Sequence, residues 1–251
     1  MKMVLLTALG VGGATIFGSV LGFIFKKISH KFSDIVLSFA AGVMLCAAVT
    51  GLIVPSLEYE SFSPLLITVA GILCGAFFLN ILDKLVPHLH RLAGVEQESH
   101  PENNAKLNKI LLFVMAIAIH NLPEGIAAGV GFGSGNNAQA FTIAAGIALQ
   151  NIPEGMVIIA PMLAAGMKPG RTFLCAMMTG VIEVLGTLLG YSAVSISTAI
   201  LPFALAFAGG TMLYVISDEM IPETHHSETR GITYALLFGF CLMLGMDFWL
   251  G

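Results

Sequence analysis

Apolar segments long enough to cross a bilayer follow one another along nearly the whole chain. A membrane-spanning helix needs about 20 mostly apolar residues, and such segments lie near residues 3–25, 34–54, 64–82, 108–131, 138–164, 171–193, 200–221 and 231–250. Within a bilayer the backbone polar groups must be satisfied inside the segment, so each segment is expected to be a helix. The sequence therefore predicts an all-α fold, a polytopic transmembrane helix bundle of about eight spans, in a single domain over residues 1–251.

The composition argues against several other classes of protein. Charged residues make up only 10% of the chain, whereas an ordinary soluble domain carries roughly 25%. The net charge of −4 and the lack of a basic stretch interleaved with aromatic residues argue against nucleic-acid binding. The four cysteines all lie in apolar segments without a Cys-x-x-Cys spacing. Neither a disulfide framework nor a structural zinc site is therefore expected.

The basic residues indicate the orientation of the bundle. Apart from Lys2, they all lie on alternate connections that share one side of the membrane: Lys26, Lys27, Lys31, Lys84, Arg91, Lys106, Lys109, Lys168, Arg171 and Arg230. Basic residues near the ends of spans favour the cytoplasmic side. Both termini are therefore predicted to lie outside. The polar loop at about residues 83–107, which carries His88, His90 and His100, is predicted to lie in the cytoplasm.

Two neighbouring spans carry nearly the same polar phrase among apolar residues. One reads His120-Asn121-Leu122-Pro123-Glu124-Gly125, and the other reads Gln150-Asn151-Ile152-Pro153-Glu154-Gly155. Ionisable side chains at membrane depth are costly, so they usually face the interior of the bundle and have partners there. Residues three and four positions apart share a helix face. His120 and Glu124 can therefore point the same way, with Asn121 close to them, and the second phrase repeats this arrangement.

The proline and the glycine of each phrase have structural consequences. Pro123 and Pro153 lack an N–H, so they are expected to interrupt the helical hydrogen-bond ladder and to kink their helices. Backbone freed in this way is tolerated in a membrane only where it is buried in protein or lines a wet cavity. The glycine after each glutamate is expected to let a neighbouring helix pack closely.

The charges of these residues favour a divalent cation. Two buried carboxylates repel each other and stay ionised together only beside a compensating positive charge, so one dication would neutralise Glu124 and Glu154. A nitrogen ligand from His120 shifts the preference toward zinc, iron, cadmium or similar ions. Glu183, alone within the next apolar segment, could complete an adjoining site. A structural His–Glu contact and a proton relay remain alternatives.

These residues resemble the signature of the ZIP (Zrt/Irt-like) divalent metal transporter family, in its bacterial GufA-like branch, and the resemblance covers essentially the whole chain. It implies a multi-pass protein of the bacterial inner (plasma) membrane that moves zinc into the cytoplasm, with cadmium, iron or manganese as other candidate substrates. It also implies a binuclear intramembrane site, and family members are commonly homodimers. By this resemblance one metal would use His120, Glu124, Gln150 and Glu154, and the adjoining metal would use Asn121, Glu124, Asn151, Glu154 and Glu183.

The resemblance implies further ligands outside the paired phrases. Met44 matches a methionine that contributes from the second span, although it could equally be a core methionine that fills a gap. Asp218 and Glu219 match an exit region at the end of the seventh span, and Asp247 matches a carboxylate of the last span. Gln150 and Asn151 stand where many relatives have a histidine and some have an acidic residue. These neutral, harder ligands are expected to weaken discrimination for soft metals.

Three other functions compete with metal transport. An intramembrane metalloenzyme would be expected to carry three zinc ligands and an open position, often as His-Glu-x-x-His on one helix, and that motif is absent from the sequence. A proton-coupled transporter of organic solutes would use Glu124 and Glu154 but would not need His120. A structural membrane protein would leave the paired phrases without a purpose. The sequence therefore favours a metal transporter that is not an enzyme.

Overall fold

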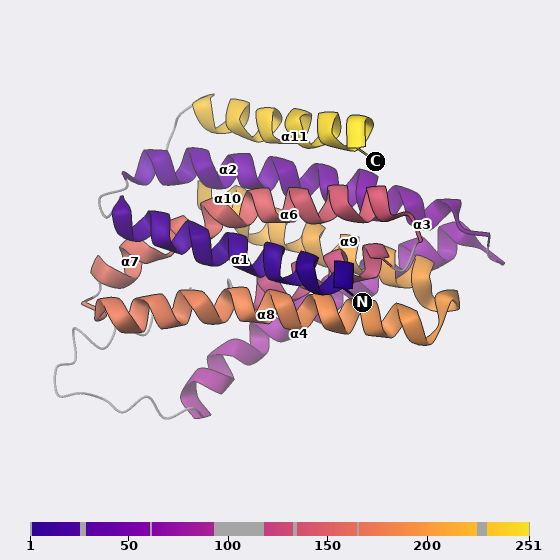
Figure 1. The fold of residues 1–251 in the computed structure, drawn as a ribbon, viewed down its shortest axis with the longest axis horizontal. Helices are drawn as coiled ribbons and strands as arrows, with labels where there is room; N and C mark the ends of the chain where they lie inside the picture. Colours follow the sequence, from indigo (N-terminus) through magenta and orange to yellow (C-terminus); the bar gives the residue numbers. More distant parts are fainter. Residues whose placement is uncertain are drawn as a thin grey trace.

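The described residues of the computed structural model form helices and the connections between them, without a strand (Figure 1). These residues are 2–25, 29–60, 62–92, 118–132, 135–164, 166–224 and 230–250. The helices are α1 (Lys2–Ile24), α2 (His30–Cys46), η1 (Ala47–Ile53), α3 (Val54–Glu58), α4 (Pro64–Leu92), α6 (Asn137–Val157), α7 (Ile159–Ala164), α8 (Pro169–Ile196), η3 (Thr198–Ile200), α9 (Leu201–Val215), η4 (Ile216–Met220), α10 (Ile221–Thr224) and α11 (Arg230–Leu250). Residues 118–131 form one more helix. The all-α prediction is confirmed.

Seven helical stretches of the described part are long and apolar enough to cross a membrane. They are Lys2–Ile24, Lys31–Glu58, Pro64–Leu82, Asn137–Ala164, Pro169–Ile196, Leu201–Thr224 and Arg230–Leu250. Each corresponds to one of the predicted spans, with boundaries that differ by a few residues. The remaining predicted span, 108–131, lies partly outside the described residues, and only its second part, 118–131, is seen as a helix.

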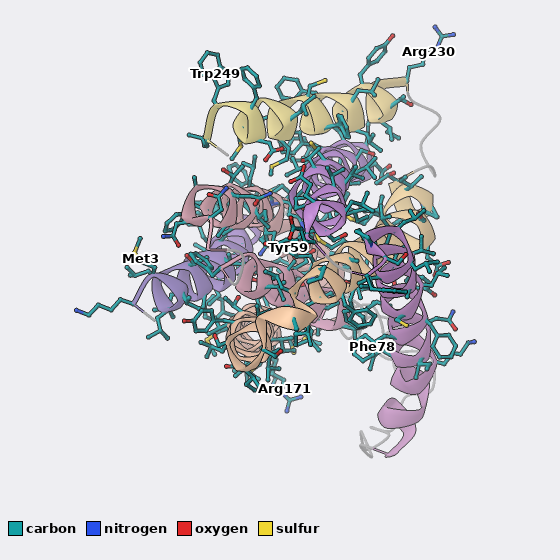
Figure 2. All side chains as sticks on the ribbon, turned by 90° about the vertical axis from the view of Figure 1, so that its right-hand side faces the viewer. Met3, Tyr59, Phe78, Arg171, Arg230 and Trp249 are labelled. Atoms are coloured by element: carbon teal, nitrogen blue, oxygen red, sulfur yellow. The ribbon has the colours of Figure 1, made fainter. Side chains whose placement is uncertain are left out.

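The helix α4 is longer than its apolar segment. A loop was expected from residue 83 onward, but the backbone stays helical to Leu92, and this end of α4 projects away from the rest of the bundle (Figures 1 and 2). Extending a formed helix adds one hydrogen bond for each residue fixed, so a helix can continue into a polar sequence outside the apolar span. His88 and His90 lie in this stretch, but their side chains, like the whole of His100, lie outside the described part.

The bundle is assembled from a few long helix contacts. α1 packs against α6 and α8, α2 packs against α6 and α11, and α4 packs against α9. α11 covers one face of the bundle, and Figure 2 shows Arg230 and Trp249, at its two ends, pointing away from the other helices. Only three residues of α11 are buried, namely Ile232, Gly239 and Met243.

The motif glycines lie at close contacts between helices, as predicted. A Cβ added at Gly125 would overlap the backbone carbonyl oxygen of Glu183 on α8, and a Cβ added at Gly155 would overlap that of Thr15 on α1. Backbones that approach this closely leave space for no side chain, which is how small residues join helices in membranes. Helix 118–131, α6, α8 and α1 are thereby held together around the two phrases.

The two motif prolines lie inside helices that continue past them, and the kinks that the sequence predicts there stay predictions. Helix 118–131 continues past Pro123, and α6 continues past Pro153 to Val157, where the helix ends with a turn at Ile158. Neither motif proline therefore ends its helix. Two other helices widen instead into π-helical segments, η1 and η4, each of which ends two residues before Pro55 or Pro222. A proline cannot donate a backbone hydrogen bond and clashes with the preceding turn, so the turn before it widens.

Part of the apolar core lies on one side of the two phrases. Its largest buried members include Leu52 of η1, Ile143 of α6 and Leu205 of α9. These residues lie toward the end of the bundle that the basic residues predict to be outside. Buried apolar side chains therefore occupy the space between the helices around these residues.

Candidate metal centre

The paired phrases place six polar side chains in the interior of the bundle. His120, Asn121 and Glu124 come from helix 118–131, and Gln150, Asn151 and Glu154 come from α6; all six are buried. The phrases meet directly, because Gln150 Nε2 donates a hydrogen bond of 2.8 Å to Glu124 Oε1. The prediction that their polar faces point inward is therefore confirmed.

Glu183 forms a second polar cluster beside the first. Asn121 Nδ2 and Asn151 Nδ2 both donate to its Oε1, at 2.7 Å and 2.8 Å. The hydroxyl of Thr15 lies 2.9 Å from Oε1 and 2.8 Å from Oε2. Glu183 thus links helix 118–131, α6 and α1 through its carboxylate, while its backbone lies against Gly125.

Acceptor oxygens in this region are buried without hydrogen-bond partners. Within the described residues these oxygens are Asn121 Oδ1, Glu124 Oε2, Gln150 Oε1 and Asn151 Oδ1. A buried polar atom without a partner is costly, so native proteins rarely leave one. All four atoms are acceptors in two adjoining clusters, and acceptor oxygens are what a cation requires.

A cavity with a volume of about 260 Å³ connects this region with one end of the bundle. It is lined by His120, Glu124, Glu154, Leu37, Val157, Ile158, Val215, Asp218, Glu219, Met220, Pro222 and Glu223. Five acidic residues and one histidine line it, while no lysine or arginine of the described part does. Such a lining concentrates cations, because apolar walls focus the field of the carboxylates.

His120 and Glu219 contact each other in the lining of this cavity. The Nε2 atom of His120 lies 2.6 Å from Oε1 of Glu219, and it donates the hydrogen bond when the ring carries its proton there. Glu219 comes from the π-helical segment η4. The extra residue in a π-turn changes the direction of the side chains that follow it, and such turns are frequent at functional sites.

The remaining predicted ligands are not all brought to this place. Asp218 and Glu219 line the cavity, but Met44 is buried among the apolar core residues and lies outside the cavity lining. Asp247 is half-buried on α11 and also lies outside the lining. Met44 and Asp247 therefore stay predictions without support from the geometry.

The acidic and histidine side chains alone do not make a ready ligand set. Among the described residues, no group of three His, Cys, Asp or Glu side chains is arranged to hold a metal. Glu124 and Glu183 are instead engaged by amides, and His120 is engaged by Glu219. A cation would bind here with amide oxygens among its ligands, and it would displace some of these contacts.

Thr15 and Glu223 lie in this region, and the sequence analysis identified neither of them. Thr15 lies on the buried face of α1, in a series of small or hydroxyl-bearing residues that includes Gly12, Gly18 and Ser19. That spacing of three and four could have indicated a face packed against other helices. It could not have indicated that Thr15 meets a carboxylate from α8.

Comparison with known proteins agrees with this geometry. The family model described as ZIP Zinc transporter matches residues 96–247. The chain is 39% identical to Zinc transporter GufA of Myxococcus xanthus, over 98% of this chain and 98% of that protein. It is 31% identical to Zinc transporter ZIP11 of Xenopus tropicalis, over 98% of this chain and 97% of that protein. It is 35% identical to Zinc transporter ZIPB of Bordetella bronchiseptica, over 95% of this chain and 78% of that protein.

Proposed function

The chain belongs to the ZIP zinc transporter family, and we propose that it carries zinc across the membrane on the side chains of its paired phrases. It is a multi-pass integral membrane protein. Membership of a transporter family sets aside the intramembrane metalloenzyme.

The unpartnered buried oxygens are the observation that carries this proposal. Asn121, Glu124, Gln150 and Asn151 each leave one acceptor oxygen without a partner in the described interior. A dication would satisfy these oxygens and would also balance the charges of Glu124 and Glu154. A structural role for the phrases would leave both costs in place.

The ligand types suit zinc at the position that opens into the cavity. Zinc binds histidine nitrogen and carboxylate oxygen, usually with four ligands, and His120, Glu124, Gln150 and Glu154 supply such a set. Three of these four line the cavity, so an ion bound there is open to exchange. Asn121, Asn151 and Glu183 lie beside this set and supply the donors for a second, adjoining ion. Iron, cadmium and manganese are further candidate substrates, because the amide ligands reduce selectivity for soft ions.

The shape of the cavity supports release toward the cytoplasm. From His120 and Glu154 the cavity extends past Glu219 to Pro222 and Glu223, at the end of the bundle where the basic residues predict the cytoplasm. On the opposite side lie the buried side chains of Leu52, Ile143 and Leu205, and we infer that they close the route there. Asp218, Glu219 and Glu223 would offer successive carboxylates to an ion that leaves, and uptake from outside requires one group of helices to move against another.

The number of spans, the orientation in the membrane and the oligomeric state are inferred from the sequence and the family. We infer about eight spans with both termini outside, and a homodimer in the inner membrane of a bacterium. The polar segment that follows α4, with His100, would then face the cytoplasm, where the family carries a metal-sensing loop.

Zinc uptake into proteoliposomes that contain a zinc-sensitive dye tests the proposal. The native chain is expected to admit zinc, and Glu124→Ala and Glu154→Ala are each expected to abolish the flux, because each removes a charged ligand. Glu58→Ala is the matched control, since Glu58 is exposed at the end of α3 and lies outside the cavity lining. Native protein that moves none of zinc, iron, manganese or cadmium would refute metal transport, and a proton-driven flux that metal does not inhibit would favour the solute transporter.

A further inference from the structure

A groove lies between α2 and α11 and shares no lining residue with the cavity of the candidate metal centre. Its volume is about 490 Å³, which is within the range of pockets that hold small ligands. No charged residue lines it. Six of its lining residues are apolar or aromatic side chains of the two helices: Ile35, Val36 and Phe39 of α2, and Tyr234, Ala235 and Phe238 of α11.

The groove ends where the two helices touch. A Cβ added at Gly239 of α11 would overlap the backbone carbonyl oxygen of Phe39 on α2, so the two backbones are in contact at this level. The rings of Phe39 and Phe238 lie beside that contact, with their centroids 6.0 Å apart. From these rings the groove extends to Gly231, next to the first residue of α11.

The length of the groove matches one leaflet of a bilayer. Both helices belong to stretches that can span a membrane, so the groove faces lipid. Phe238 lies eight residues after Arg230, which is a rise of about 12 Å along a helix. One leaflet contributes about half of the 30 Å hydrocarbon core. The groove therefore suits one acyl chain, on the side where the basic residues predict the cytoplasm.

Two basic residues lie at the mouth of the groove. Arg230 precedes Gly231 in the chain and is exposed, and Figure 2 shows it pointing away from the other helices. Lys31 is also exposed, and it shares a helix face with Ile35, one turn further along α2. Asp34 is buried and does not line the groove. Basic residues between spans on the cytoplasmic side are a typical site for an anionic lipid headgroup.

We propose that an anionic phospholipid of the cytoplasmic leaflet binds in this groove, with one acyl chain between α2 and α11 and its headgroup beside Lys31 and Arg230. The chain would also contact Pro153 of α6, which lines the groove. The next residue, Glu154, lines the polar cavity instead. The second phrase thus lies between the lipid and the cavity, and the inference does not depend on the ion that the cavity admits.

The single tryptophan of the chain allows a fluorescence test. Trp249→Phe removes that indole, which lies at the end of α11 far from the groove, and Tyr234→Trp then introduces an indole into the groove lining. The full chain is reconstituted in phosphatidylcholine bilayers that contain the same small fraction of brominated phosphatidylglycerol or brominated phosphatidylcholine with identical chains. Bromine quenches an indole that it contacts, so the quenching reports which lipid occupies the groove.

Phosphatidylglycerol is expected to quench the indole in Tyr234→Trp more strongly than phosphatidylcholine does. Each basic residue near the membrane surface strengthens the attraction of an anionic lipid about 5-fold, so two residues predict a preference of about 25-fold. Leu237→Trp in the same background is the matched control, because Leu237 is exposed on the same helix outside the groove lining. There the two lipids should quench equally.

Further substitutions separate the charge of the site from its shape. Lys31→Gln combined with Arg230→Gln is expected to abolish the preference for phosphatidylglycerol. Arg171→Gln should leave it unchanged, because Arg171 is exposed on α8, on the opposite side of the bundle from α11 (Figure 2). Ala235→Phe fills part of the groove and should reduce quenching by phosphatidylglycerol. The melting temperature of each variant shows whether it is folded.

Four results would overturn the inference. Equal quenching by the two lipids in Tyr234→Trp would remove the selectivity for an anionic headgroup. An equal loss of preference in Arg171→Gln and in the double variant would show a diffuse effect of surface charge. Undiminished quenching in folded Ala235→Phe would place the lipid elsewhere. Quenching by neither lipid in Tyr234→Trp, although both quench Leu237→Trp, would show that a protein segment such as a second copy covers the groove. None of these results depends on zinc transport, so the proposed function and this inference can fail separately.

Discussion

A single methyl group at Gly186 is expected to separate α8 from helix 118–131 and so to disturb the proposed metal centre. Gly186 lies on α8, and a Cβ added there would stand 2.5 Å from the backbone carbonyl oxygen of Leu122 on the motif helix. Ordinary contact for such a pair begins at 3.4 Å, so the helices would have to separate by 3.4 − 2.5 = 0.9 Å at this point. The obstacle is backbone on both sides, so no side chain can turn aside to make room.

The separation would act directly on the hydrogen bond between the same two helices. Asn121 Nδ2 donates to Glu183 Oε1 at 2.7 Å, and an added 0.9 Å would bring the distance to about 3.6 Å, at which it is no longer a hydrogen bond. Overpacking costs about 1–3 kcal/mol of folding stability. Disturbing the groups that orient metal ligands weakens binding about 10- to 100-fold.

Gly186→Ala is therefore expected to lower the melting temperature and to raise the zinc dissociation constant at least 10-fold. Gly10→Ala makes the same chemical change on α1, at a position with nothing within 4 Å, and alanine should there stabilise the helix by about 1 kcal/mol. Zinc titration and thermal unfolding in detergent measure both effects. Native affinity and stability in Gly186→Ala would show that the approach of the two helices does not determine the geometry of the site.

Three further outcomes are expected. Gln150→His adds a nitrogen ligand, so uptake from a mixture of zinc and manganese should shift toward zinc; an unchanged ratio would remove Gln150 from the ligand set. Glu219→Gln removes the carboxylate at the inner side of His120, so zinc flux should fall while equilibrium binding persists, and a flux equal to that of the native chain would contradict an exit route past Glu219. Zinc at 100 times its dissociation constant should stabilise the native chain by about 2.7 kcal/mol. This stabilisation should be absent from Glu154→Ala, and a rise in melting temperature equal in both proteins would place the ion elsewhere.

The sequence predicted those features that depend on residues close together in the chain. An apolar segment of spanning length is visible without knowledge of its neighbours, so the positions of the seven spans seen in the described part were predictable to within a few residues. The paired phrases were equally visible, because ionisable residues inside apolar segments are rare and need partners. The glycine after each glutamate was correctly expected to mark a close contact.

The features that escaped prediction depend on residues far apart in the chain. Thr15 and Glu183 are separated by 168 positions, and His120 and Glu219 by 99. No local pattern shows which helices become neighbours, so neither pair could be derived. The backbone around the prolines also differs from one position to another: Pro123 lies within a helix that continues, whereas a π-helical segment precedes Pro222.

The apolar core on the predicted outer side has a consequence for membrane energetics. A cavity that admits ions also admits water, and an unbroken thread of water across the bilayer would conduct protons and discharge the gradient that the cell maintains. The buried side chains of Leu52, Ile143 and Leu205 would interrupt that thread on the predicted outer side of the proposed metal centre. On the proposed function, a few polar side chains would select the ion, whereas buried apolar residues would insulate the membrane during transport.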